Sequence, residues 1–178
     1  MQRIQLIMEE VGLKQKDRTV VAPAREYAQK NMKKLSNNDI SSATAFELED
    51  GTIITGKSSD IMVSCAAAIL NAVKHLAGIG DEIMLISPNV LETIINMKKD
   101  NLHSKYCALS LEEILIALSI SAVTNPTAQM ALDKLSQLKG IQGHCTIMLT
   151  HNDEQTLRKL GIDMTCDAEY PSENLSYS

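Results

Sequence analysis

The chain alternates between short runs of β-prone residues and longer segments in which apolar residues recur at helical spacing. The most apolar segment begins at Ser59 or Asp60 and runs to Ala77 with few interruptions, and its polar residues gather on one side: Ser64, Asn71, Lys74 and His75. This pattern predicts a largely buried central helix that ends at Gly78 and Gly80.

Other helices are predicted from apolar spacing and from residues that favour helix ends. Ser110 and Glu113 have the spacing of a capping box ahead of Ile114–Ala122, and Asn125-Pro126 both ends that helix and begins the next one. The remaining predicted helices are Met1–Gly12, Ala24–Leu35, Pro88–Lys98, a segment carrying Ala128–Leu138, and Asn152–Leu160.

The strands are predicted from β-branched or continuous apolar runs. Thr44–Glu49 and Thr52–Thr55 are joined by Asp50-Gly51, a dipeptide that strongly favours a hairpin. Further strands are predicted at Thr19–Ala22, Ile83–Ile86, Thr146–Leu149 and Ile162–Cys166. Strands that alternate with helices, together with one antiparallel hairpin, predict an α/β fold: a three-layer sandwich with a mixed sheet.

The expected domain organisation follows from these elements. Residues 1–35 form an N-terminal helical or linking segment, residues 36–170 form the α/β domain, and residues 171–178 form a flexible tail. Ser36–Ser42 is the best candidate for a linker, because it is polar and lies between two patterned regions.

Composition narrows the classes of partner. A net charge of −5 without a broad basic cluster argues against nucleic acid as a partner. No apolar stretch approaches the length of a membrane span, and the acidic N-terminal segment does not fit a signal peptide, so a cytoplasmic location with no membrane partner is expected. The four cysteines are widely separated, which predicts reduced thiols, no metal site and no cofactor.

Residues 51–58 match the phosphate-binding pattern G-x-x-x-x-G-K-[ST] letter for letter. A phosphate-binding loop must curl its N–H groups around the ligand, whereas Thr52–Thr55 is β-branched throughout and favours an extended backbone. We therefore interpret Gly51 as part of the hairpin turn and the following residues as a strand.

A narrower anion-binding hypothesis remains for the residues at the expected change from strand to helix. Gly56, Lys57, Ser58, Ser59 and Asp60 would bring N–H groups, hydroxyls and an ammonium together at the positive end of a helix. The alternative is that Ser59 or Asp60 caps the helix while Lys57 lies in solvent.

Leu48–Gly56 resembles the hairpin of the cytidine deaminases, a family in which the next helix carries [HC]-A-E and a following strand ends in P-C-x-x-C. Cys65-Ala66-Ala67 falls where the first motif would lie, and Pro88–Glu92 falls where the second would lie. The resemblance implies a deaminase-like core. It does not imply zinc chemistry, because Ala67 replaces the glutamate and Asn89 and Glu92 replace two cysteine ligands.

A second resemblance covers nearly the whole chain. The segments 22–26, 55–60, 115–126 and 159–166 are similar to the C-terminal part of the bacterial domain-of-unknown-function 1846 (UPF 0371) family. Members of that family are considerably longer, so the resemblance implies a missing N-terminal portion as a partner. It implies no activity.

Three functional hypotheses follow. The first is a non-catalytic C-terminal module of a longer protein, which acts in domain packing, oligomerisation with further copies, or ligand sensing. The second is an enzyme or nucleotide-binding domain that holds a small anionic ligand at Gly56–Asp60. The third places a metal at Cys65 with help from Glu92. No catalytic residue is assigned, because the four histidines show neither a shared spacing nor a carboxylate partner.

Overall fold

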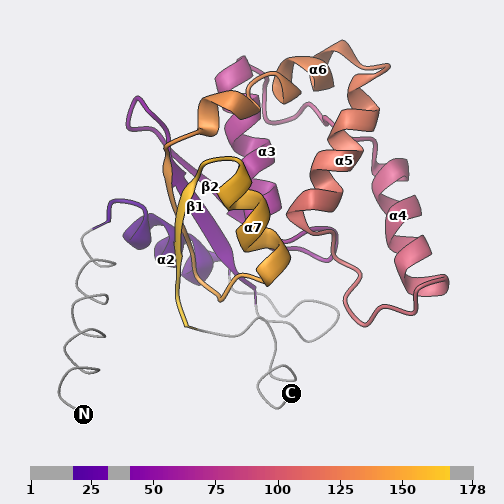
Figure 1. Ribbon diagram of the computed structural model, residues 1–178, viewed down its shortest axis with the longest axis horizontal. Helices are drawn as coiled ribbons and strands as arrows, with labels where there is room; N and C mark the ends of the chain where they lie inside the picture. The colour runs from indigo at the N-terminus through magenta and orange to yellow at the C-terminus, as the bar shows by residue number, and fades with distance from the viewer. Residues whose placement is uncertain (1–17, 32–40, 169–178) are drawn as a thin grey trace.

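A mixed sheet forms the centre of the structure, a computed structural model that describes residues 18–31 and 41–168 (Figure 1). Within these residues the sheet has four strands in the order β2-β1-β3-β4. β1 is antiparallel to both β2 and β3, and β3 is parallel to β4. The bounds are Ala43–Glu47 for β1, Ile53–Lys57 for β2, Gln142–Cys145 for β3 and Asp163–Cys166 for β4. The predicted α/β class and the mixed sheet are confirmed.

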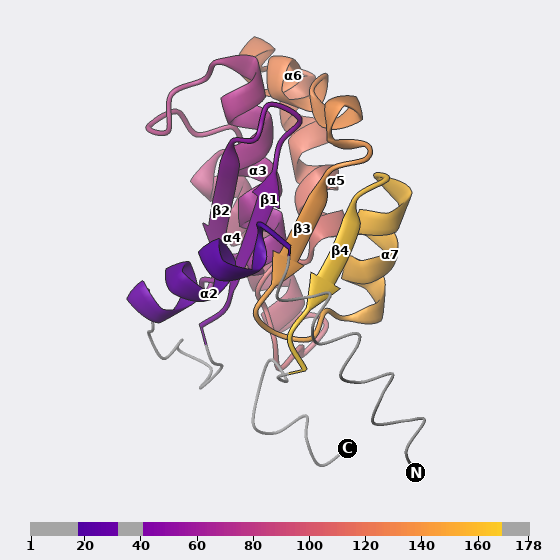
Figure 2. The ribbon, with the colours of Figure 1, turned by 90° about the vertical axis from the view of Figure 1, so that its left-hand side faces the viewer.

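Helices cover both faces of this sheet. α2 (Val21–Lys30) lies on one face, where Val20 and Ala24 pack against Ala45 of β1 (Figures 1 and 2). α3 (Ser64–Ala77) and α7 (His151–Lys159) lie on the other face, and α5 (Leu111–Ala122) packs behind them. α4 (Pro88–Asp100), α6 (Pro126–Leu132) and a short 3-10 helix at Leu135–Leu138 complete the described helices. β1 is therefore buried from both sides.

One local sequence signal for a turn and two for helix caps are confirmed. Leu48 N–H donates to Thr52 O across the hairpin turn, and Gly51 adopts a φ of 87°, a conformation that favours glycine. Ser110 and Glu113 form the reciprocal capping box of α5. Asn125 Oδ1 caps α6 by accepting from Thr127 N–H at 3.0 Å.

Three predicted strands differ from the structure. Residues 19–20 form a turn and residues 21–22 begin α2, where Val20 and Val21 are buried by packing of this segment on the sheet. Residues 83–86 form a loop instead, in which Leu85 and Ile86 are buried by side-chain packing against the core and not by pairing with a strand. β3 lies earlier than Thr146–Leu149, because β1 starts at Ala43 and the pairing with β3 ends there, where Thr146 N–H donates to Ala43 O.

Part of the expected organisation lies outside the described residues. The predicted helix at residues 1–12, most of the linker at residues 36–42 and the tail after residue 170 belong to this part. The boundaries of the proposed segments therefore stay predictions. Among the helices that are described, none is both long and apolar enough to cross a bilayer.

Candidate functional site

The residues predicted to start the central helix lie before it instead. α3 begins at Ser64 after Val63, whose N–H donates to Leu109 O at 3.0 Å. Gly56 and Lys57 end β2, and residues 58–60 form the turn that follows it. The extended backbone of β2 and its pairing with β1 confirm that the phosphate-loop match is a hairpin strand. Whether Gly56–Asp60 binds an anion stays a prediction.

Gly56 allows β2 and α3 to approach closely. A Cβ at this position would lie 2.2 Å from the backbone nitrogen of Ala68, a separation that no real side chain tolerates. Ser58 ties the end of β2 to the start of β1, because Ser42 N–H donates to its hydroxyl at 2.7 Å. Gly56 and Ser58 therefore have structural partners that explain their identities.

The other three predicted residues differ in exposure and bonding. Lys57 is exposed, and its Nζ lies 3.4 Å from Asn31 Oδ1. The hydroxyl of Ser59 accepts from the N–H groups of Ile61 and Met62 and so stabilises the turn. Asp60 is exposed at the tip of this turn. Of the five predicted residues, Lys57 and Ser59 line a pocket beside β2, whereas Gly56, Ser58 and Asp60 do not.

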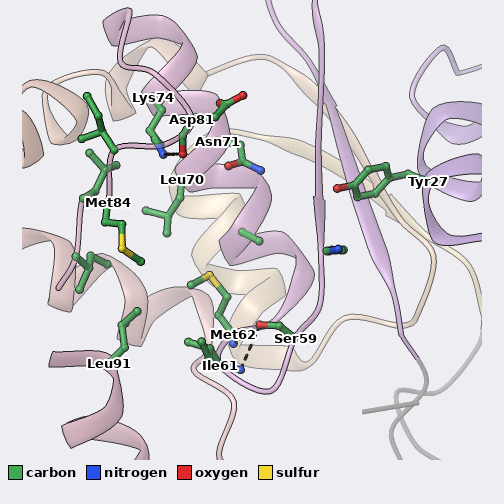
Figure 3. Close-up of a pocket in the computed structure, with 15 residues that line it drawn as sticks. Tyr27, Ser59, Ile61, Met62, Leu70, Asn71, Lys74, Asp81, Met84 and Leu91 are labelled. Atoms are coloured by element: carbon green, nitrogen blue, oxygen red, sulfur yellow. Dashed lines mark hydrogen bonds between the residues drawn. The ribbon is translucent and has the colours of Figure 1, made fainter. Parts of the chain in front are cut away.

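This pocket, which we call the β2-edge pocket, has a volume of about 380 Å³ and lies between β2, α3 and the loop of residues 81–86 (Figure 3). That volume falls within the range of small-molecule sites. One stripe of α3 forms a wall, because Ala67, Leu70, Asn71 and Lys74 recur at helical spacing. The other lining residues are Tyr27, Lys57, Ser59, Ile61, Met62, Asp81, Ile83, Met84, Leu85, Ile86 and Leu91.

The pocket combines an apolar floor with a few polar groups. Met62, Leu70 and Met84 point into the space shown in Figure 3, and Ile83 and Met84 are exposed although they are apolar. Asn71 uses its amide nitrogen to donate to Thr55 O at 2.9 Å, which fixes the side chain against the edge of β2. Such a lining suits a ligand that has an apolar body.

Lys74 is the one cation on the pocket wall that is buried, with only 9% of the residue exposed. Its Nζ donates to the main-chain carbonyl of Asp81 at 2.9 Å. Among the described residues, no carboxylate forms an ion pair with this ammonium. The carbonyls at the end of α3 lower the cost of its charge but do not neutralise it.

A second polar cluster lies under α2 on the opposite face of the sheet. His144 of β3 is fully buried, with Nδ1 2.7 Å from Thr165 Oγ1 and Nε2 3.1 Å from Asp167 Oδ1. Arg25 of α2 donates to both oxygens of Asp167, at 2.7 and 3.2 Å. A hydroxyl, an imidazole and a carboxylate in line resemble a catalytic relay, but the imidazole is fully buried and Arg25 bonds both oxygens of the carboxylate, so the cluster serves to hold α2 on the sheet.

Electrostatics agree with this structural role. Burial lowers the pKa of His144 below its ordinary value, although the neighbouring Asp167 acts in the opposite direction. Burial raises the pKa of Asp167, but hydrogen bonds from Arg25, together with the charge that His144 carries once it is protonated in acid, outweigh it and leave the pKa below its ordinary value. A neutral imidazole beside an ionised, arginine-bound carboxylate follows.

The cysteine singled out for a metal is enclosed by the core. Cys65 is 1% exposed, and burial raises the pKa of its thiol well above the ordinary value. Its neighbour Ser64 bonds the hydroxyl of Thr44 at 2.9 Å, in a cluster of small hydroxyls at the start of α3. Glu92, the suggested second ligand, is exposed on α4. The enclosed thiol packs as a small apolar group.

Sequence reasoning noticed some of these groups and missed others. Asn71 and Lys74 were expected on the polar side of the central helix, whereas Tyr27 of α2 had no signal that placed it at the pocket. The His144–Asp167 contact was also missed. Its only signal is the parallel pairing of β3 with β4, in which His144 lies opposite Thr165.

Comparison with known proteins identifies the relatives of this chain. A family model described as "Domain of unknown function DUF1846, C-terminal" matches residues 16–176. A UPF0371 protein of Clostridium tetani is 60% identical over 176 residues, which is 99% of this chain but 35% of the relative. UPF0371 proteins of Clostridioides difficile and Clostridium botulinum are 58% and 60% identical over the same shares. The chain therefore belongs to the DUF1846 family and corresponds to its C-terminal domain, about a third of the length of these relatives.

Proposed function

We propose that this domain is a non-catalytic packing module, which docks through the outer face of α4 and α5 onto further polypeptide of the kind that its relatives carry. The observation that carries the proposal is the exposure of apolar side chains on α5. We propose the cytoplasm as its location, which the four free cysteines support.

α5 is apolar on nearly all sides. Its inner face is fully buried at Ile114 and Leu118, yet Ile116 is 54% exposed and Ile120 is 63% exposed. Val123, directly after the helix, continues the same stripe at 82% exposure. A helix that is hydrophobic all round is normally covered on all sides. The outer face of α5 therefore has the composition of a contact surface.

α4 extends this apolar surface. Of its 13 residues only Leu91 is buried, and Met97 is 40% exposed. A shallow groove of about 320 Å³ runs between the two helices. Its lining residues are Asn89, Val90, Thr93, Ile94, Ile116, Ala117 and Ile120. Apart from the polar Asn89 and Thr93, this lining is aliphatic, as the centre of a protein interface often is.

The length of the relatives suggests what covers this face. They carry nearly two thirds of their length outside the part that matches this chain. A second copy of the chain is the competing occupant, because an aliphatic stripe on one helix is able to pair with itself. The two occupants predict different masses in solution.

The test mixes this chain with the N-terminal two thirds of the Clostridium tetani relative and measures mass by sedimentation velocity. We expect a one-to-one complex that Ile120→Asp abolishes, because a carboxylate on the stripe would be buried without a partner. The matched control Gln155→Asp places the same charge on the exposed face of α7. A homodimer, or a complex that survives Ile120→Asp, would refute the proposal.

A further inference from the structure

Beyond the packing function, we propose that the β2-edge pocket binds a small organic anion with an aliphatic body, whose charged group pairs with Lys74. Three independent observations support this ligand class: the uncompensated ammonium, the apolar floor and the volume of the pocket.

The charge of Lys74 indicates the sign of the ligand. A buried ammonium is costly unless a counter-charge or several hydrogen bonds compensate it. Here Nζ has one carbonyl acceptor, Asp81 O, and no carboxylate partner among the described residues. An ammonium carries three donors, so it is able to bond an anion in addition to this carbonyl. The contrast with Lys98, which is paired with Glu113 at 2.9 Å, shows that the fold neutralises a comparable lysine internally.

The floor of the pocket indicates the body of the ligand. Leu70 on α3, Met62 before α3 and Met84 on the loop converge on the same space (Figure 3). Methionine side chains adapt to irregular aliphatic shapes. Polar bodies such as sugars or nucleosides would find few partners there, because Asn71 and Ser59 already bond the backbone.

The volume of the pocket limits the size of the ligand, and the residues at its rim determine which charges the ligand meets on entry. About 380 Å³ admits a short aliphatic chain but not a folded peptide. Lys57 and Asp81, both exposed lining residues, place one positive and one negative charge at the rim. Two of the residues predicted for an anion site, Lys57 and Ser59, thus border a pocket whose inner charge is Lys74.

The experiment uses the complete 178-residue chain with its methionine methyl groups labelled for NMR. The probes are octanoate and octyl phosphate, which carry different anionic groups, with octanol and inorganic phosphate as controls. We expect both anionic amphiphiles to shift the methyl signals of Met62 and Met84, which line the pocket, and to leave those of Met130 and Met148 unchanged. Octanol should bind at least tenfold more weakly, and inorganic phosphate should produce no shift.

Lys74→Met should weaken both anions at least tenfold and leave octanol unchanged, whereas Lys159→Met, on the exposed end of α7, should change nothing. If Lys74→Met does not fold, the affinities of the unaltered chain for octanoate and octanol still test the proposal. The proposal is overturned if neither anion shifts Met62 and Met84, if octanol binds as tightly as octanoate, or if folded Lys74→Met retains full affinity.

Discussion

The two faces of this domain differ in whether their charged and apolar side chains find partners within the domain. On the α2 side, every charge of the cluster formed by Arg25, His144 and Asp167 has a partner within the domain. On the α4–α5 side, Ile116 and Ile120 lie in solvent, and Lys74 in the β2-edge pocket lacks a counter-ion among the described residues. The cluster on the α2 side is complete in itself. The α4–α5 side instead presents apolar side chains and an ammonium that are available to contact other molecules.

The largest effect is expected where β2 meets α3, on the face of the sheet opposite α2 (Figure 1). Gly56→Ala should lower the free energy of unfolding by about 3 kcal/mol or more, at the upper end of the cost of overpacking, because its Cβ would overlap the backbone of Ala68. Gly80→Ala is the matched control, since its Cβ meets only the movable carboxylate of Glu82. Denaturant unfolding measures both, and equal losses would contradict the account.

The cluster under α2 should respond next. Asp167→Ala should cost about 1–3 kcal/mol, because it leaves the fully buried ring of His144 without its acceptor and releases Arg25. Asp163→Ala, which removes a carboxylate that is 68% exposed, should cost far less. Similar melting temperatures for the two variants would argue that α2 does not depend on this cluster.

The same cluster predicts how stability depends on pH. The pKa of His144 is lowered below 6.5 in the folded state by burial and by the charges of Arg25 and Arg18, against the effect of Asp167. The unfolded chain then binds more protons between the two pKa values, so stability falls as the pH drops through 6.5. Thermal melts from neutral to about pH 5, with an NMR titration of His144, check this. A ring that titrates above 6.5 would reverse the sign.

Lys74 should behave in the opposite way to Asp167. Lys74→Met should leave the free energy of unfolding unchanged or raise it by about 1 kcal/mol, because an apolar side chain replaces a buried charge that has no counter-ion. Denaturant unfolding of the ligand-free chain is the measurement. A large loss of stability would mean that the ammonium is needed for folding, and the proposal that Lys74 serves to bind an anion would lose its main support.

The sequence signals for hairpin turns and helix caps predicted local structure well, because each depends only on residues within a short segment. The Asp50-Gly51 turn, the capping box at Ser110 and the Asn125 cap need only their own segment. The strand at residues 83–86 failed for the opposite reason. A short apolar run is buried equally well by strand pairing or by packing of a loop on the core, and no short window of sequence distinguishes the two.

The candidate site was only partly predictable for the same reason. Asn71 and Lys74 share a helix face, so helical spacing alone places them together. Tyr27, Lys57 and Met84 join them from three other segments, and that convergence depends on the packing of α2, β2 and the loop before α4. The helix start at Ser64 rather than at residue 59 or 60 was also a tertiary effect, since Val63 bonds to Leu109.

The smallest effect on the isolated chain is expected on the α5 stripe. Ile120→Asp should change the free energy of unfolding by no more than about 0.5 kcal/mol, because the side chain already lies mostly in solvent.

The measurement that tests the packing proposal most directly is therefore the dissociation constant between this chain and the N-terminal two thirds of the Clostridium tetani relative, determined by titration calorimetry. The account predicts a complex that Ile120→Asp weakens at least tenfold and Gln155→Asp leaves unchanged. No heat of binding, or equal affinity for both variants, would contradict it.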